Sequence, residues 1–431
     1  MQTFPRGIHL EDNKNKTKNK AIEAANIPSK IILPLLQNLG CPCEPIVKVG
    51  DIVTAGQKIA DSSKQISAPI HSSIAGKVTR VENDLIVIEG QGEESRQPKA
   101  ESRAQENSRE EIINKIHDAG IVGLGGAGFP THVKLTPPPG KKIDTIIING
   151  CECEPFITAD HRLMLERTDD IIFGAQIIAK AVGASRIIFA IEENKRDAIE
   201  KMKVESRKLK VEIRIEVVLL KTKYPQGGER QVIKAVTGKE VPSGGLPADI
   251  GVIVDNVATA VAIAEAIKYG KPLTEKVITV TGSGIKEPKN LLVKLGTPIE
   301  DVINQCGGLT ENAAKIIMGG PMMGIALSSL TVPIVKQTNC ILVMTKEEVK
   351  NYEEQGCIRC GRCIKACPAG LMPNFLCEFS KLKNWEKLEE HALADCIECG
   401  CCSYVCPSRI YLVQYFKTAK YEMRIRKTVC K

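Results

Sequence analysis

The 431-residue sequence lacks any run that approaches the roughly 18–20 consecutive apolar residues needed to span a membrane as a helix. Its first segment, MQTFPRGIHLEDNKNK, also lacks the apolar core of a signal peptide. If the protein works at a membrane, these absences predict that other subunits hold it there. The segment 411–427, YLVQYFKTAKYEMRIRK, is expected to form a helix that packs back onto the preceding region. A helix lying on a membrane surface is the alternative for this segment.

Aromatic residues are scarce, at 4% of the chain, and charge of one sign is only mildly in excess. The 59 Lys and Arg residues outnumber the 51 Asp and Glu residues by 8, and the excess is spread along the chain. No basic stripe interleaved with aromatic residues appears, which argues against nucleic-acid binding. The modest excess is typical of a solvated surface, with an acidic protein partner or an anionic membrane surface as the alternative. Length and an apolar content of 43% indicate a globular protein of about two to four domains.

Cysteine, in contrast, is abundant, with 17 copies. A disulfide scaffold this rich in cysteine would be a small secreted domain, so in a chain of this length the thiols are expected to be reduced, as in a cytosolic compartment. Cys401 breaks the period of its neighbours and is interpreted as a non-ligand. Two runs have the pattern C-x2-C-x2-C-x3-C followed by proline, namely Cys357, Cys360, Cys363 and Cys367, and then Cys396, Cys399, Cys402 and Cys406.

This spacing is typical of a ferredoxin-like domain with two [4Fe–4S] clusters. Three thiolates at i, i+3 and i+6 can wrap one face of a cubane, and in two-cluster folds the fourth cysteine of each run ligates the other cluster. A pair of zinc sites is the alternative, but zinc does not require this tight pattern twice. The sequence therefore predicts the transfer of single electrons. Cluster one is predicted to take Cys357, Cys360, Cys363 and Cys406, and cluster two Cys396, Cys399, Cys402 and Cys367.

The first third of the chain changes pattern once. Residues 30–90 read as short strands with Gly-Asp and Ala-Gly turns, which resembles a barrel sandwich of the biotinyl/lipoyl type. Lys64 lies at the expected hairpin tip, but the usual modification sequence is absent, so the sandwich is expected to be unmodified. Residues 91–111 contain no β-branched or aromatic side chain and are expected to be a linker that runs into a helix.

Strands and helices are then predicted to alternate from about residue 118 to 271, which indicates an α/β domain with a largely parallel sheet. The expected strands are 145–149, 186–193 and 211–220, and the expected helices are 171–182, 195–208 and 256–268. Residues 276–343 return to strand-like segments, with one helix at 298–305, and favour a small β-grasp unit.

A glycine-rich segment, GLGGAGFP at 123–130, is the first sign of a nucleotide site. Glycines allow backbone N–H groups to approach a phosphate or a flavin ring closely. The segment does not follow a strand, as a dinucleotide fingerprint requires, but Lys134 lies close behind it and could meet a phosphate. In an open α/β sheet, ligands gather at the carboxyl ends of strands. Polar loops at 149–155, 224–230 and 254–257 fall there, although each could be ordinary turn or cap chemistry.

Several of these motifs resemble the RnfC family, whose members are subunits of the Rnf electron-transport complex. They are GIVGLGGAGFPTHVKL, NGCECEP, ADHRLM, KYPQGGERQ and VDNVATA, together with the opening FPRGIHLEDNK. The order of the predicted domains agrees, and the resemblance covers essentially the whole chain. The α/β domain is in turn similar to the NADH- and FMN-binding flavoprotein subunit of respiratory complex I, whose flavin loop reads GRGGAGFPTGLKW and whose next motif reads NGDESEPG.

The resemblance implies the following site residues. An FMN pocket would be shaped by Gly123, Gly125, Gly126 and Gly128, with Lys134 approaching the phosphate. The flavin would be lined by Asn149, Glu152, Gly227 and Asn256. The nicotinamide nucleotide would stack on Phe129, with Glu154 and Glu229 nearby. The chain departs from the complex I pattern at Leu124, which replaces Arg, at Cys151 and Cys153, which replace Asp and Ser, at Gly228, which replaces Glu, and at Asp255, which replaces Asn.

The expected fold is multidomain α+β. We expect a barrel-sandwich domain at 1–90, a linker at 91–111, an α/β FMN/NADH-binding domain at 112–272, a β-grasp (SLBB-like) domain at 273–344, and a dicluster ferredoxin-like domain with a C-terminal helix at 345–431.

The resemblance implies a peripheral subunit at the cytoplasmic face of the cell membrane. It would pass electrons between two [4Fe–4S] clusters and NAD(H) through non-covalent FMN, with no side chain acting as acid or base. A flavin is needed because NADH transfers two electrons as a hydride and a cluster carries one. The implied partners are membrane subunits that pump Na+ or H+ and a ferredoxin-reactive iron–sulfur subunit. A soluble cobalamin (corrin) reductase and an electron-transfer adapter without flavin are the alternatives.

Overall fold

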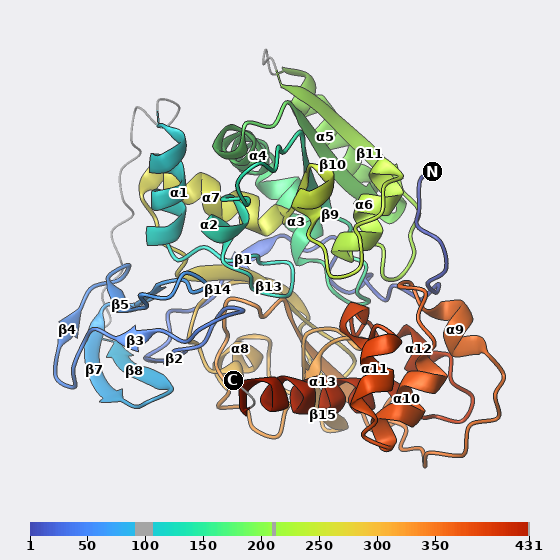
Figure 1. Ribbon diagram of the computed structural model, residues 1–431. Coiled ribbons are helices and arrows are strands. Elements are labelled where there is room, and N and C mark those ends of the chain that lie inside the picture. Colours follow the sequence, from blue (N-terminus) through green and yellow to red (C-terminus); the bar gives the residue numbers. More distant parts are fainter. Residues whose placement is uncertain (91–106, 209–212, 430–431) are drawn as a thin grey trace.

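A computed structural model describes residues 1–90, 107–208 and 213–429, and Figure 1 shows how its parts are arranged. The expected linker at 91–111 falls mostly outside the described residues. Its last residues belong to α1 (Arg109–Asp118), which Ser108 begins by a reciprocal capping box with Glu111.

The N-terminal sandwich consists of two small antiparallel sheets that pack face to face. One has the order β2-β8-β7-β4 and the other β3-β5-β6. Ile31 and Leu33 of β2 alternate with more exposed neighbours, and they pack inward with Ile86 and Ile88 of β8. The strands are β2 (Lys30–Pro34), β3 (Glu44–Pro45), β4 (Ile52–Val53), β5 (Lys58–Asp61), β6 (Ile70–His71), β7 (Gly76–Val81) and β8 (Leu85–Gly90).

The α/β unit is built on a parallel sheet of order β11-β10-β9-β12, so the predicted parallel sheet is confirmed. Alternate residues of each strand serve different faces: Ile146 and Ile148 pack with α4 and α7, whereas Ile147 packs with α6. The strands are β9 (Thr145–Gly150), β10 (Arg186–Glu192), β11 (Arg214–Leu220) and β12 (Val252–Asn256). The helices are α2 (Thr131–Lys134), α3 (Ala159–Glu166), α4 (Thr168–Val182), α5 (Arg196–Lys208), α6 (Glu229–Thr237) and α7 (Val257–Tyr269), with short 3-10 turns η1 (Glu193–Lys195) and η2 (Pro247–Ile250).

The third unit is a mixed sheet of order β1-β14-β13-β17-β15-β16. The sequence placed residues 1–90 in the sandwich, whereas β1 pairs with β14 of this sheet, because strand pairing across such a separation leaves no local signal. The strands are β1 (Ile22–Ala24), β13 (Glu275–Thr281), β14 (Lys289–Lys294), β15 (Ala313–Met318), β16 (Ile325–Ala326) and β17 (Cys340–Thr345), with α8 (Ile299–Gln305) where one helix was expected.

The C-terminal unit is helical and has its own core. Its last helix, α13 (Leu412–Val429), packs Leu412, Phe416 and Ala419 against Leu376 and Leu388, as expected for a tail that folds back. Across the described ranges, no helix is long and apolar enough to cross a membrane. The other helices are α9 (Arg362–Ala366), α10 (Pro373–Lys381), α11 (Trp385–Glu390), η3 (Leu393–Asp395) and α12 (Cys401–Tyr404).

Candidate cofactor sites

The glycine loop lies between α1 and α2 and is closed at its base. The Gly123 N–H donates to the Phe129 carbonyl at 2.9 Å, and the Leu124 N–H donates to the Thr259 hydroxyl of α7 at 2.9 Å. The tip, including Gly125 and Gly126, is exposed. A Cβ on Gly126 would meet no atom of the described residues within 4 Å apart from its chain neighbours. The loop therefore leaves open space beside its backbone.

Three polar positions predicted for the flavin meet at the carboxyl edge of the sheet. The Asn149 side chain, at the end of β9, donates to the Gly227 carbonyl at 2.8 Å. Asn256, at the end of β12, accepts from the Ala258 N–H at 2.8 Å and so caps α7. A Cβ on Gly125 would come within 3.0 Å of Asn256, so the glycine loop borders this edge.

Lys134 lies behind the loop and holds a cation close to the sheet edge. Its ammonium donates to the Val254 carbonyl at 2.7 Å and to Glu229 at 3.2 Å, and lies 3.9 Å from Asp255. Burial lowers its pKa, but the negative charges of Glu229 and Asp255 outweigh this and raise it overall. Neither carboxylate oxygen of Asp255 accepts a hydrogen bond from the described part of the chain. Burial raises the pKa of Asp255 to about 6.

The two glutamates of NGCECEP have their carboxylates held by backbone amides. Glu152, with φ of 47°, accepts from the Asp160 N–H at 2.6 Å and the His161 N–H at 3.3 Å, at the start of α3. Glu154 accepts from the Met322 and Met323 N–H groups at 2.7 and 3.1 Å, and thus joins the α/β unit to the third unit. In this structure, therefore, these carboxylates serve contacts within the protein.

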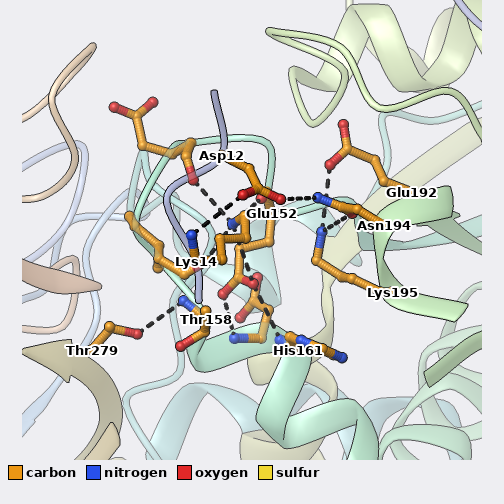
Figure 2. Close-up of polar contacts among 12 residues, drawn as sticks. Asp12, Lys14, Glu152, Thr158, His161, Glu192, Asn194, Lys195 and Thr279 are labelled. Carbon is orange, nitrogen blue, oxygen red and sulfur yellow. Dashed lines mark hydrogen bonds and ion pairs between the residues drawn. The ribbon is translucent and has the colours of Figure 1, made fainter. Parts of the chain in front are cut away.

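A buried lysine from the N-terminal segment, which sequence reasoning missed, completes this loop (Figure 2). Lys14 is 3% exposed and donates to the carbonyls of Glu152 at 2.9 Å, Glu154 at 3.1 Å and Ile157, while its ammonium lies 3.8 Å from the Glu152 carboxylate. Burial raises the pKa of Glu152 to about 7. The only signal in the sequence is the opening motif, whose lysines look like an ordinary solvated run.

A second buried lysine supports the same loop from β10's side. The Lys195 ammonium donates to the Cys151 carbonyl at 2.5 Å and lies 3.4 Å from the Glu192 carboxylate, both side chains being 1% exposed. Figure 2 shows Lys195 beside Glu192 and Asn194, next to the loop that carries Glu152. The conformation of NGCECEP is thus fixed by two buried cations.

The second cysteine run surrounds a cavity together with one cysteine of the first run. The cavity is lined by apolar Leu371, Leu376, Val413 and Phe416 and by the sulfur-bearing Cys367, Cys396, Cys399, Cys401 and Cys402. Burial raises the pKa of the Cys402 thiol, and the nearby Cys396, Cys399 and Cys367 raise it further. Four thiols around an apolar cavity are the donor set that a [4Fe–4S] cluster takes, so the residues fit this cofactor.

The first run is more open. Cys357 and Cys360 are exposed, and Cys363 and Cys406 are half-buried. Burial raises the pKa of Cys363, and Cys406 of the second run adds to this rise, so the two thiols are neighbours. Among the described residues, no group of three or more His, Cys, Asp or Glu side chains could hold a single metal ion. A cubane binds each thiolate at a separate iron corner, which needs a wider arrangement than one ion does.

A parallel sheet with an open glycine loop at its carboxyl edge, joined to a helical unit with two cysteine runs, defines the class of iron–sulfur flavoprotein folds. Family comparisons agree with this class. Residues 116–265 match the Nuo51 FMN-binding domain, residues 2–95 the RnfC barrel sandwich hybrid domain, and residues 277–326 the SLBB domain.

Curated relatives are similar over almost the whole chain. The RnfC-type subunit of the proton-translocating ferredoxin:NAD(+) oxidoreductase complex of Clostridium ljungdahlii is 47% identical over 98% of this chain and 94% of its own. Its counterpart in the Na(+)-translocating complex of Acetobacterium woodii is 42% identical over 98% and 97%. The chain belongs to the RnfC family, which confirms the resemblance and the fold class.

A solved structure of an NAD+-reducing [NiFe]-hydrogenase in the H2-reduced state shares the fold. It is 18% identical, with a TM-score of 0.54, over 72% of this chain and 61% of that chain. At this identity the likeness concerns the fold alone.

Proposed function

We propose that this chain is the NAD(H)-reacting subunit of an ion-translocating ferredoxin:NAD+ oxidoreductase complex. The observation that carries the proposal is the match of residues 116–265 to an FMN-binding domain in a chain whose relatives are named as subunits of such complexes. When bound, FMN supplies the conversion between the hydride of NADH and single electrons. The names of these relatives favour this function over a soluble corrin reductase.

The chain's own residues would hold FMN at the carboxyl edge of the sheet. The open tip at Gly125 and Gly126 would let backbone N–H groups approach the flavin, and Lys134 would neutralise phosphate charge. Asn149, Gly227 and Asn256 would line the ring, since their hydrogen bonds already bring β9, β12 and the loop at 224–230 together. Phe129, Glu154 and Glu229 would face the nicotinamide nucleotide, and Glu152 would complete the flavin pocket.

Two [4Fe–4S] clusters would occupy the C-terminal unit with crossed ligation. The cavity lined by Cys367, Cys396, Cys399 and Cys402 supports cluster two, and the proximity of Cys406 to Cys363 supports cluster one. The domain boundaries predicted from the sequence remain part of this proposal. Other subunits of the complex, including membrane subunits and a ferredoxin-reactive iron–sulfur subunit, would hold the chain peripherally at the cytoplasmic face.

A pair of glycine variants tests the flavin site. Gly126 has φ of +149° and Gly140 has φ of +82°, and a Cβ on either meets no described atom within 4 Å beyond its chain neighbours. Both Ala variants therefore carry backbone strain without a clash, but only Gly126 borders the proposed flavin. Gly126→Ala should lose most of its FMN while keeping its iron, and Gly140→Ala should keep both. Normal FMN content in Gly126→Ala would contradict the assignment, and its absence from the wild-type chain would favour a flavin-less adapter.

A further inference from the structure

The α/β unit touches the second cysteine run directly through Tyr224. Its side chain is 1% exposed, and its hydroxyl donates to the Cys399 carbonyl at 2.7 Å. Tyr224 lies on the same loop as Gly227, and three residues of chain span at most about 11 Å. One short loop thus contacts both the proposed flavin edge and a proposed cluster ligand.

Packed side chains fill the space between these two ends of the loop. The Gly227 N–H donates to the Cys153 sulfur at 3.2 Å, and Cys153 packs against the buried group that contains Tyr224, Cys399 and Cys401. No water-filled gap needs to be crossed along this route, because each residue contacts the next.

Ion pairs and backbone packing fasten the same run to the α/β and third units. Arg230, one residue into α6, pairs with Asp395 at 3.2 Å, and the Ser243 hydroxyl also bonds Asp395, just before Cys396. A Cβ on Gly400 would come within 2.9 Å of the Met322 carbonyl, so the third unit also closes on this run.

The first run has the opposite environment. Cys357 and Cys360 are exposed, and Ile358 between them is 68% exposed. Since one run is buried against the flavin-binding unit and the other faces outward, the two proposed clusters cannot have equivalent roles.

We propose that the cluster of Cys396, Cys399, Cys402 and Cys367 is the one that exchanges electrons with the flavin, that Tyr224 positions it, and that the first-run cluster is the outlet to a partner. This rests on the proposed function. Each NADH oxidised to NAD+ releases two electrons and one H+. The electrons pass singly, each lowering the charge of the second-run cluster from 2+ to 1+ until the first-run cluster takes it.

Two ligand variants test the order by EPR on the anaerobically prepared chain, mixed with NADH or with dithionite. In Cys399→Ser, NADH should reduce the flavin but leave the first-run cluster oxidised within one turnover, whereas dithionite should reduce it. In Cys360→Ser, NADH should still reduce the second-run cluster. The reverse pattern would overturn the proposal. Failure of NADH to reduce any cluster in the wild-type chain would instead refute the proposed function.

If Cys399→Ser loses all its iron, Tyr224→Phe decides. This variant removes one hydroxyl and should slow reduction of the second-run cluster by NADH about ten-fold and shift its potential, without changing the first-run signal. Tyr411→Phe is the matched control, since the Tyr411 hydroxyl donates to the Tyr352 carbonyl at 3.0 Å, away from the α/β unit. Wild-type kinetics and an unchanged potential in Tyr224→Phe would overturn the positioning role.

Discussion

Replacement of Lys14 by methionine removes a buried cation while keeping a side chain of similar length. The three loop carbonyls lose their donor, and the Glu152 carboxylate, 3.8 Å from the ammonium, loses its counter-charge. At this separation and an effective dielectric constant of about 20, the attraction is about 4 kcal/mol. Removing one partner of a buried pair costs about 3–5 kcal/mol.

The lower end of this range is expected for Lys14. Burial lowers the pKa of Lys14 and raises that of Glu152 to about 7, so the pair is partly neutral near pH 7. A loss of about 3 kcal/mol corresponds to a fall of roughly 6–12 °C in the unfolding midpoint of a domain of this size. Thermal unfolding followed by circular dichroism measures it, and hydrogen exchange in residues 2–20 should rise.

Lys16→Met is the control for this prediction. The exposed Lys16 donates to the Gly282 carbonyl and the Ser283 hydroxyl, both at 3.1 Å, and its loss should cost less than about 1 kcal/mol. If Lys14→Met unfolds within 2 °C of the wild-type chain, as Lys16→Met is expected to, the buried lysine does not anchor the N-terminal segment.

Three further outcomes are expected. Burial and then the charges of Lys336 and Lys58 lower the pKa of His71 to about 3, so the stability it contributes is complete above pH 6.5 and is lost as pH falls; about 2 kcal/mol should go between pH 7.5 and 5, and His71→Leu should flatten this slope in urea unfolding. Asp255 has a raised folded pKa, so its contribution is complete below about pH 3.9 and lost as pH rises through about 6; Asp255→Asn should stabilise the flavin-free chain by about 3 kcal/mol at pH 7.5, and an equal or lower stability would contradict this. A Cβ on Gly174 of α4 would lie 2.0 Å from the Ala260 carbonyl of α7, so Gly174→Ala should destabilise by about 1–3 kcal/mol, whereas Gly183→Ala, whose Cβ meets no described atom beyond its chain neighbours, should reflect backbone strain alone.

Local patterns were enough to predict the α/β unit. The buried run TIIIN became β9, and the Ala-rich segment after Asn256 became α7, because burial periodicity and a cap act over a few residues. The polar edge was also predictable, since strand ends of a parallel sheet lie together.

Contacts between distant segments were not predictable in this way. Lys14 meets Glu152 across 138 positions of sequence, and Tyr224 meets Cys399 across 175. A lysine in a charged run and a tyrosine in a turn look alike whether they are buried or solvated, so only the assembled fold reveals their partners.

The central claim is that one chain joins an NADH-reactive flavin to two clusters, and an anaerobic NADH titration of the purified complex tests it most directly. Flavin, iron and zinc should be quantified on the same sample while absorbance and EPR follow each addition. The account predicts one FMN and about eight iron atoms for this chain, with bleaching of the flavin and the appearance of two cluster signals on NADH addition. Zinc in place of iron, or clusters that only dithionite reduces, would contradict it.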